Sequence, residues 1–302
     1  MIQTMQRESI ISFPALGLQM NPPASIHVLG RDIYFYGILI AAGFMLAILY
    51  CSRQSKRFGL KEDDVYDLML WLLPLSILGA RLYYVAFSYQ DYIGHPEKIF
   101  AVWEGGLAIY GGVIAGVLTV IGVCRHKKIP VGAMLDLVVF GLLMGQIIGR
   151  WGNFMNREAF GAETEIFCRM GLTAADGTTI YVHPTFLYES LWNLLVLIGL
   201  ILIERKGKRR YDGQCTLLYF FFYGLGRMWI EGLRTDSLYI GASGIRVSQL
   251  LSLLLVAAAG LGLLIMKKRA PSPEKLYVNV VKTREAAQSK EEKITGAAED
   301  RK

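Results

Sequence analysis

The segment that decides the fold is residues 131–161, VGAMLDLVVFGLLMGQIIGRWGNFMNREAFG. Its first part, residues 131–149, is an apolar run of about the 20 residues that a helix needs to cross a bilayer. Two arginines, two asparagines and a glutamate follow: Arg150, Asn153, Asn156, Arg157 and Glu158. Charged side chains beside a bilayer are costly, and a cluster of them usually marks a substrate or ion site. The segment therefore predicts a membrane helix with a polar site at its end.

The composition of the whole chain is that of a membrane protein. Its 302 residues are 53% hydrophobic with a mean hydropathy of +0.38, more apolar than an ordinary soluble domain. Several apolar windows are too long and too many for a signal peptide, and they lack the alternation of barrel strands. Continuous apolar runs in lipid favour helices. The sequence predicts an all-α polytopic membrane protein. Its seven transmembrane helices are expected at 33–52, 66–87, 103–124, 131–149, 184–204, 214–232 and 247–266.

Basic residues collect in alternate loops, which predicts the topology. Lysine and arginine are dense at 53–61, 125–128, 205–210 and 267–269, whereas Lys98 is the one lysine in the loops of the opposite side. By the positive-inside rule, the N-terminus lies outside and the C-terminus in the cytoplasm of a bacterial cytoplasmic (inner) membrane. The same distribution explains the net charge of +7 without a nucleic-acid partner.

Three parts of the chain are expected. Residues 1–32 form an extracytoplasmic arm, residues 33–266 the membrane catalytic domain, and residues 267–302 a charged, partly ordered or disordered cytoplasmic tail. The catalytic domain includes a small outer head, 150–183, in which Ala174–Thr179 is typical of a turn between short strands. The cysteines show no CxxC spacing, so they are interpreted as structural and no metal site is expected: Cys51, Cys124, Cys168 and Cys215.

Arginines at the outer helix ends suggest a site for an anion. Tyr223, Arg227 and Glu231 are spaced by four and share one helical face, and the topology brings Arg81 and Arg150 to the same side and depth. Several guanidinium groups with few acids suit a phosphate, which they bind in bidentate fashion. A phosphate at this depth is what a phospholipid headgroup supplies. The alternative is that Arg227 and Glu231 form only an i,i+4 ion pair while Arg150 snorkels to the interface.

Other positions are open to two interpretations. Gly105-Gly106 and Gly111-Gly112 at the start of the third helix allow a lipid, or simply another helix, to approach the backbone. His183 could be a base or could brace the start of the fifth helix. Tyr36, early in the first helix, could belong to the site or to an interfacial aromatic belt.

Together these motifs resemble a known family. The stretch Gly149–Glu158 with Gly161 is specific, and it is reinforced in order by other segments: Tyr36-Gly37, Gly79–Leu82, Gly111-Gly112, His183–Thr185 and the series Tyr223, Arg227, Glu231. Between about residues 30 and 250, the chain resembles the phosphatidylglycerol–prolipoprotein diacylglyceryl transferases.

The resemblance implies a transferase that moves a diacylglyceryl group from phosphatidylglycerol to the lipobox cysteine of a preprolipoprotein signal peptide, releasing glycerol phosphate. It implies no metal and no cofactor. The catalytic residues would be Tyr36, Tyr110, Arg150, Arg227 and Glu231. The substrate-binding residues would be Arg81, Arg150, Asn153, Asn156, Glu158, Gly161, His183 and Tyr223.

One position departs from the family pattern. Tyr110 stands where many members have a histidine that has been considered the base, and a phenol is a poor base at neutral pH. Either Tyr110 donates a hydrogen bond, or the thiol proton leaves through Glu231, Glu158 or the lipid phosphate. The competing function is a transporter or flippase for an anionic lipid or solute. The odd helix count, the absence of repeats and the charges near one face argue against it.

Overall fold

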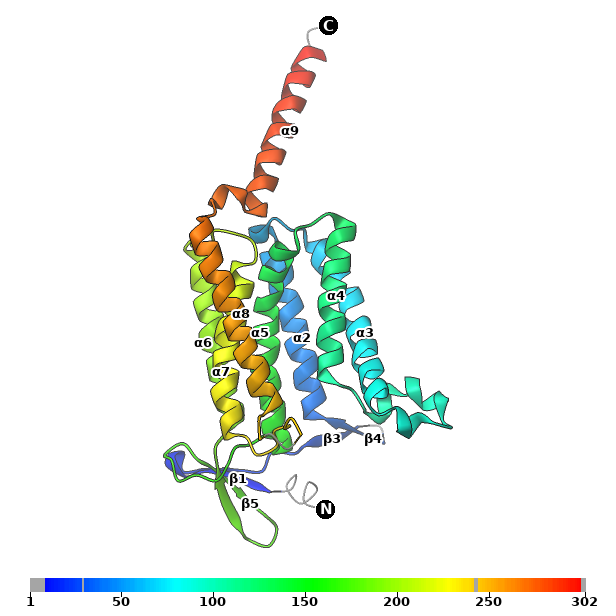
Figure 1. Cartoon of the computed structure of the whole chain (residues 1–302), viewed down its shortest axis with the longest axis vertical. Helices are drawn as coiled ribbons and strands as arrows, with labels where there is room; N and C mark the ends of the chain where they lie inside the picture. The colour runs from blue at the N-terminus through cyan, green and yellow to red at the C-terminus, as the bar shows by residue number, and fades with distance from the viewer. Residues whose placement is uncertain (1–8, 29, 242–243, 300–302) are drawn as a thin grey trace. The chain divides into compact units, whose positions relative to one another are not determined.

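The computed structural model describes residues 9–28, 30–241 and 244–299 and is mostly helical (Figure 1). A helix lies at each of the seven predicted positions. These helices are α2 (Phe35–Gln54), α3 (Glu62–Phe87), α4 (Ile109–Lys127), α5 (Val131–Asn156), α6 (Thr185–Arg205), α7 (Gln214–Leu233) and α8 (Val247–Arg269). Six helices of the described chain are long and apolar enough to cross a membrane, which makes this a polytopic membrane protein.

Helix α7 is the one of the seven that is not among those six. Its 20 residues are long enough, but they include Arg227 and Glu231 as well as two tyrosines. These side chains lower the mean hydropathy of α7. A membrane span is therefore hardest to detect from hydropathy where it carries the polar residues of a site.

Two predicted helix boundaries were wrong. Helix α5 continues to Asn156 instead of ending at 149, so Arg150 lies inside the helix and the motif is largely helical. Helix α4 begins at Ile109 and not at 103, because Gly105 and Gly106 have φ values of +88° and +68°. These left-handed conformations interrupt a helix. Short 3-10 helices fill the connection from α3 to α4: η3 (Tyr89–Tyr92), η4 (Pro96–Phe100) and η5 (Val102–Glu104).

The chain divides into two compact units. The first unit comprises Met1–Ala47, Val139–Arg209 and Gln214–Pro271. The second unit comprises Ile48–Val138, Arg210–Gly213 and Ser272–Lys302.

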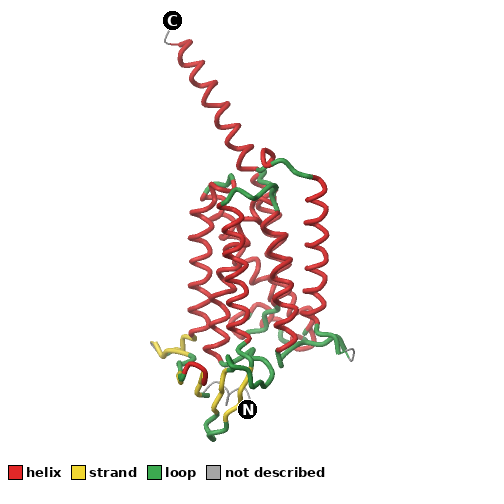
Figure 2. Tube along the Cα trace, turned by 90° about the vertical axis from the view of Figure 1, so that its left-hand side faces the viewer, coloured by secondary structure: helices red, strands yellow, loops and turns green. Residues whose placement is uncertain are grey.

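The first unit joins helices to a small sheet. Strands β1 (Ile10–Phe13), β2 (Leu18–Met20), β5 (Met170–Thr173) and β6 (Thr179–Val182) form an antiparallel sheet in the order β2-β1-β5-β6. The predicted strand–turn–strand of the head is confirmed. The all-α class, however, omits this sheet and the hairpin of β3 (Ser25–Val28) and β4 (Arg31–Tyr34) that leads into α2. In Figure 2 the strands gather at one end of the helices of this unit.

The N-terminal arm is part of this sheet. Ile11 of β1 pairs with Leu172 of β5, and both side chains are buried. They share a core with Phe154 at the end of α5 and Phe186 at the start of α6. Burial of these apolar side chains, each contributing about 1.5–3 kcal/mol, fixes the polar motif against the head.

Close helix contacts organise the second unit. A Cβ atom added to Gly79 of α3 would lie 2.8 Å from the Gly111 carbonyl oxygen of α4, so only glycine permits this crossing. At the other end of the pair, the Lys127 ammonium binds the Asp64 carboxylate at 2.8 Å.

The tail is more regular than the sequence predicted. After the 3-10 turn η6 (Pro273–Lys275), it forms helix α9 (Tyr277–Glu299), whose first residues pack on Gly59 (Figures 1 and 2). Alanine and glutamate are the commonest residues of α9, and both favour helices even without a core to bury.

Candidate functional site

An ion-pair network joins α5, α6 and α7 in the first unit. Arg150 Nη2 lies 2.5 Å from Glu189 Oε1, and Arg227 Nη1 lies 3.2 Å from Glu189 Oε2. Arg227 Nη2 also binds Glu231 Oε2 at 2.5 Å. The two carboxylate side chains are 4% and 2% exposed, whereas the guanidinium side chains of Arg150 and Arg227 keep 23% and 16%. The carboxylates therefore form the floor of the site and the arginines its accessible face.

Amide side chains extend the network towards solvent. Arg150 Nη1 donates to Asn153 Oδ1 at 3.3 Å, and Asn153 Nδ2 donates to Glu158 Oε1 at 3.0 Å. Asn156 Nδ2 reaches the same Glu158 oxygen at 3.3 Å. The backbone reverses after α5, with positive φ at Arg157, and this turn brings the exposed Glu158 back over the helix end. Polar groups thus run continuously from a buried floor to an exposed rim.

Glu189 is the residue that the sequence analysis missed. It lies in the second turn of α6, inside an otherwise apolar helix, and it touches both arginines. An ionisable residue in a membrane segment is itself a signal of function. The expectation of arginines with few acids was wrong, because Glu189 and Glu231 balance the two guanidinium charges.

Balanced charge does not close the site to an anion. In the described part of the chain, two of the five N–H groups of Arg150 have acceptors, on Glu189 and Asn153. The i,i+4 pair of Arg227 and Glu231 exists, but Arg227 also reaches across to Glu189, so it is more than a local helix contact. Carboxylates that hold two guanidinium groups in fixed orientations pre-organise them for a tetrahedral anion.

Aromatic residues support the buried side of the network. Tyr223 lies one turn before Arg227 and stacks on Tyr219 with ring centroids 5.4 Å apart. Gln146 Nε2 of α5 donates to the Tyr219 hydroxyl at 2.9 Å. A Cβ atom on Gly226 would lie 2.2 Å from Trp192 Nε1, so α6 and α7 meet at a glycine beside the network.

Tyr36 and Gly161 have packing roles in the structure. A Cβ atom on Gly152 would lie 2.4 Å from Tyr36 Cδ2, so the Tyr36 ring covers the motif helix and is 37% exposed. Gly161 fits between His183 and Leu233: its N–H donates to the His183 carbonyl at 2.9 Å, and an added Cβ would lie 2.9 Å from the Leu233 oxygen.

His183 is placed to brace the start of α6. Its Nδ1 atom lies 3.4 Å from the Tyr188 hydroxyl, and its backbone N–H donates to the Ala162 carbonyl. Burial lowers the pKa of the imidazole, which favours the neutral ring. These contacts favour the bracing role over that of a base.

Arg157 ties the motif to the arm. Its guanidinium group donates to the carbonyls of Ser9, Met155 and Pro22 and to Asn21 Oδ1, at 2.7–3.0 Å. The residue is 2% exposed and all four acceptors are neutral. Arg157 is therefore a structural member of the motif.

Arg81, in the second unit, has a similar environment. Four of its N–H contacts go to backbone carbonyls: Lys98, Ile99, Gly105 and Gly106. A Cβ atom on Gly106 would lie 2.5 Å from Arg81 Nη1, so the glycine allows its carbonyl to approach the cation. The predicted role of Arg81 in substrate binding stays a prediction, while the contacts in the structure hold the α3–α4 connection.

Tyr110 also belongs to the second unit. It lies in the first turn of α4 and is partly buried, directly before Gly111 and its close contact with α3. Within residues 9–28, 30–241 and 244–299, no group of three or more histidine, cysteine or acidic residues could hold a metal ion.

The geometry defines a class: a helical membrane protein with an arginine–carboxylate network that joins three of its helices. Residues 23–266 match the family model described as prolipoprotein diacylglyceryl transferase. The chain is 47% identical over 261 residues to the phosphatidylglycerol–prolipoprotein diacylglyceryl transferase of Enterococcus faecalis, covering 84% of this chain and 93% of the relative. It is 40% identical over 264 residues to the enzyme of that name from Synechococcus elongatus, covering 84% and 91%. The chain belongs to the prolipoprotein diacylglyceryl transferase family.

Proposed function

We propose that this protein transfers the diacylglyceryl group of phosphatidylglycerol to the lipobox cysteine thiol of preprolipoproteins, at the outer face of a bacterial cytoplasmic membrane. The observation that carries the proposal is the convergence of Arg150 and Arg227, from two different helices, on the buried Glu189. Membership of a transferase family favours this function over transport of an anionic lipid.

The arginines are proposed to hold the lipid phosphate. Both side chains keep exposed surface above the buried carboxylates, and Asn153 and Asn156 add neutral donors at the rim. Charge builds on the phosphate oxygen as its bond to the glyceryl carbon breaks. Fixed cations stabilise that charge more in the transition state than in the ground state. Glu231, buried against Arg227, orients the guanidinium group.

The reaction needs a thiolate and a leaving group. The lipobox sulfur forms a bond to the glyceryl carbon, and the electron pair of the carbon–oxygen bond passes to glycerol phosphate. Glu158 is the exposed carboxylate of the network, and we propose that it accepts the thiol proton. It then passes this proton to the leaving phosphate. Nearby guanidinium groups also favour the thiolate form. Tyr110 donates a hydrogen bond in place of the usual histidine.

The topology of this proposal puts the N-terminus outside and the C-terminus in the cytoplasm, with seven spans including α7. Basic residues at the ends of α4 and α8 then face the cytoplasm, as the positive-inside rule requires. The sheet of arm and head lies at the outer face, beside the network. Both acyl tails stay in hydrocarbon if the lipid enters sideways between helices.

The function is tested with purified protein in detergent, phosphatidylglycerol and a synthetic lipobox peptide. We expect the peptide mass to rise by one diacylglyceryl group, with glycerol phosphate released in equal amount. Transfer of a phosphatidyl group to the peptide would exclude the proposed reaction. So would a peptide of unchanged mass after incubation with active protein in the native membrane. A Tyr110→Phe variant tests the hydrogen bond: full activity would show that its hydroxyl has no part.

A further inference from the structure

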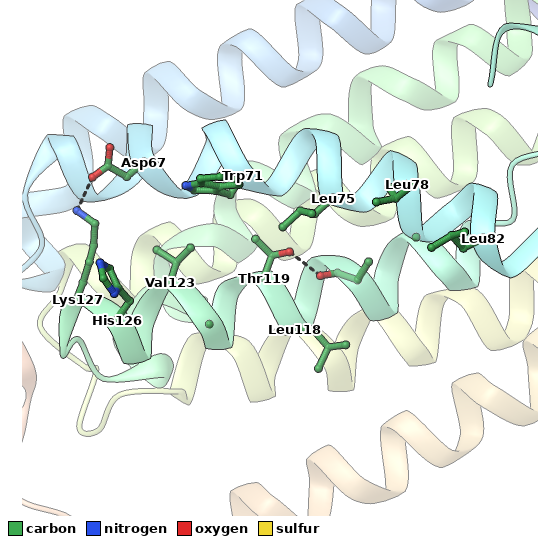
Figure 3. Close-up of a pocket in the computed structure, with 13 residues that line it drawn as sticks. Asp67, Trp71, Leu75, Leu78, Leu82, Leu118, Thr119, Val123, His126 and Lys127 are labelled. Carbon is green, nitrogen blue, oxygen red and sulfur yellow. Dashed lines mark hydrogen bonds and ion pairs between the residues drawn. The ribbon is translucent and has the colours of Figure 1, made fainter. Parts of the chain in front are cut away.

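A groove runs along the surface of the second unit between α3 and α4 (Figure 3). Its volume is about 1020 Å³. Helix α3 contributes one face, with Trp71, Leu75 and Leu78 among the residues shown, and α4 contributes the other. No step of the proposed lipid chemistry uses this groove.

The groove has the size and lining of a site for a third helix. Along α4, Ala115, Thr119 and Gly122 recur at helical spacing and form a floor of small residues, which allows helix backbones to approach closely. Leu82 and Asp67 line the groove 15 residues apart on α3. This length corresponds to about 22 Å of helix, enough for the apolar region of about 7–15 residues in a signal peptide.

One end of the groove carries a cluster of ion pairs. Lys127 binds Asp64 at 2.8 Å and Asp67 at 2.6 Å, so two carboxylates face one ammonium group. The Asp67 side chain is 53% exposed. His126 also lines this end, whereas Asp64 and the exposed Arg125 do not line the groove. The exposed Asp67 carboxylate is therefore the group at this end that a basic segment would contact.

The direction of the groove also matches a signal peptide. Its charged end adjoins the basic 125–128 loop, which the proposed topology puts in the cytoplasm, where the basic end of a signal peptide remains. Its other end reaches Gly79 and Leu82, and Gly79 touches Gly111, next to Tyr110. A peptide seated in this direction would carry its lipobox to the end of the unit that holds the position of the family's usual histidine.

We propose that the α3–α4 groove docks the apolar helix of the preprolipoprotein signal peptide, with its basic N-terminal residues at Asp67. This inference rests on the proposed function and specifies where its protein substrate binds. It makes Asp67, Thr119 and Gly122 determinants of peptide recognition and not of lipid chemistry.

The test fills the groove. A Cβ atom on Gly122 meets nothing within 4 Å, so Gly122→Leu occupies the groove without a clash. Gly199 of α6 is equally open, and Gly199→Leu is the matched control. With a full signal peptide as acceptor and phosphatidylglycerol as donor, we expect Gly122→Leu to raise the KM for the peptide about tenfold and to leave that for the lipid unchanged. A short lipobox peptide without the apolar region should react equally with both variants.

A charge exchange tests the direction. Asp67→Lys should weaken transfer to a peptide with a basic N-terminus and improve transfer to one in which those residues are glutamate. An unchanged peptide KM in Gly122→Leu, or a raised lipid KM instead, would overturn the docking site while wild-type transfer still supports the proposed function. Absence of any transfer by the wild-type protein would count against the proposed function itself.

Discussion

Arg227 and Arg81 are both arginines in apolar helices, the first partly exposed and the second buried, and the two regions around them use the positive charge differently. Around Arg81 in the second unit, backbone carbonyls of residues 98–106 accept its hydrogen bonds, and the residue is 3% exposed. Around Arg227 in the first unit, the acceptors are the Glu189 and Glu231 carboxylates, and one side of the guanidinium group stays accessible.

The difference shows what makes a buried arginine available to a substrate. Arg81 donates to four backbone carbonyls fixed by the fold, and Arg157 donates to three carbonyls and the Asn21 amide oxygen. A carboxylate orients an arginine through one edge and leaves the other edge free. Arginines that pair with buried carboxylates are therefore the candidates for anion binding in this protein.

The largest expected effect is at the accessible arginines. Replacing Arg150 or Arg227 with lysine keeps the charge but loses the bidentate fork, so we expect kcat/KM to fall by about 10²–10³. The measurement is the rate of peptide lipidation in detergent. Arg205→Lys, at the last residue of α6, is the control and should keep full activity. Near-normal rates for both site variants would contradict bidentate holding of the phosphate.

The second effect is at the shared carboxylate. Glu189→Gln removes the charge that orients Arg150 and Arg227 and leaves both cations under-compensated in a buried site. We expect loss of about 3–5 kcal/mol of stability together with a strong loss of activity. Thermal unfolding and lipidation rates measure the two effects. The head variant Glu165→Gln should change neither, and a fully active Glu189→Gln would remove this residue from the site.

A smaller and different effect is expected at the carbonyl-bound arginine. Arg81→Lys cannot reach all four carbonyls, so we expect about 1.5–3 kcal/mol less stability for each bond to a charged donor that is lost. Faster proteolysis between residues 88 and 108 would report the released connection. The KM for phosphatidylglycerol should stay unchanged in the folded fraction. A selective rise of that KM would instead restore Arg81 to the lipid site.

The sequence predicts the positions of the helices. It does not predict which arginines bind carboxylates and which bind backbone carbonyls. Apolar length located all seven helices, and the turn at Ala174–Thr179 located the head hairpin. Both arginines look the same in sequence, since each is a cation in an apolar helix. The difference appears only in the structure, where the positive φ of Gly105 and Gly106 accompanies the approach of their carbonyls to Arg81.

Long-range pairing also escaped the sequence. Ile10–Ser12 pair with residues 171–173, and nothing in either short strand specifies a partner so distant in the chain. Glu189 carried a local signal, as an acid in an apolar helix, but its contact with two arginines depends on how three helices pack. The hydrophobic pattern therefore predicted the helices and the head hairpin. The partners of the polar residues depend on contacts between parts of the chain that are distant in sequence.

The smallest expected effect concerns a third kind of arginine pair, in which only the carboxylate is exposed. Arg234 donates from Nε and Nη2 to the two Asp236 oxygens at 2.9 and 2.7 Å, and the Asp236 side chain is 50% exposed. Arg234 holds the pKa of Asp236 below its usual range. The unfolded carboxyl binds a proton first as the pH falls, so this pair stabilises the protein above a pH of about 4 and is lost below it.

Solvent screens the half-exposed Asp236 carboxylate, so the contribution of the pair is small, within about 1 kcal/mol. We expect Asp236→Asn to lower the thermal midpoint slightly at pH 7 and to match the wild type at pH 3, when both are measured in the same detergent. The difference should also shrink in high salt, because exposed ion pairs are screened there. A loss as large as that of Glu189→Gln would show that burial is not what separates these carboxylates. The regions around Arg81 and Arg227 would then differ only in the geometry of their arginine contacts.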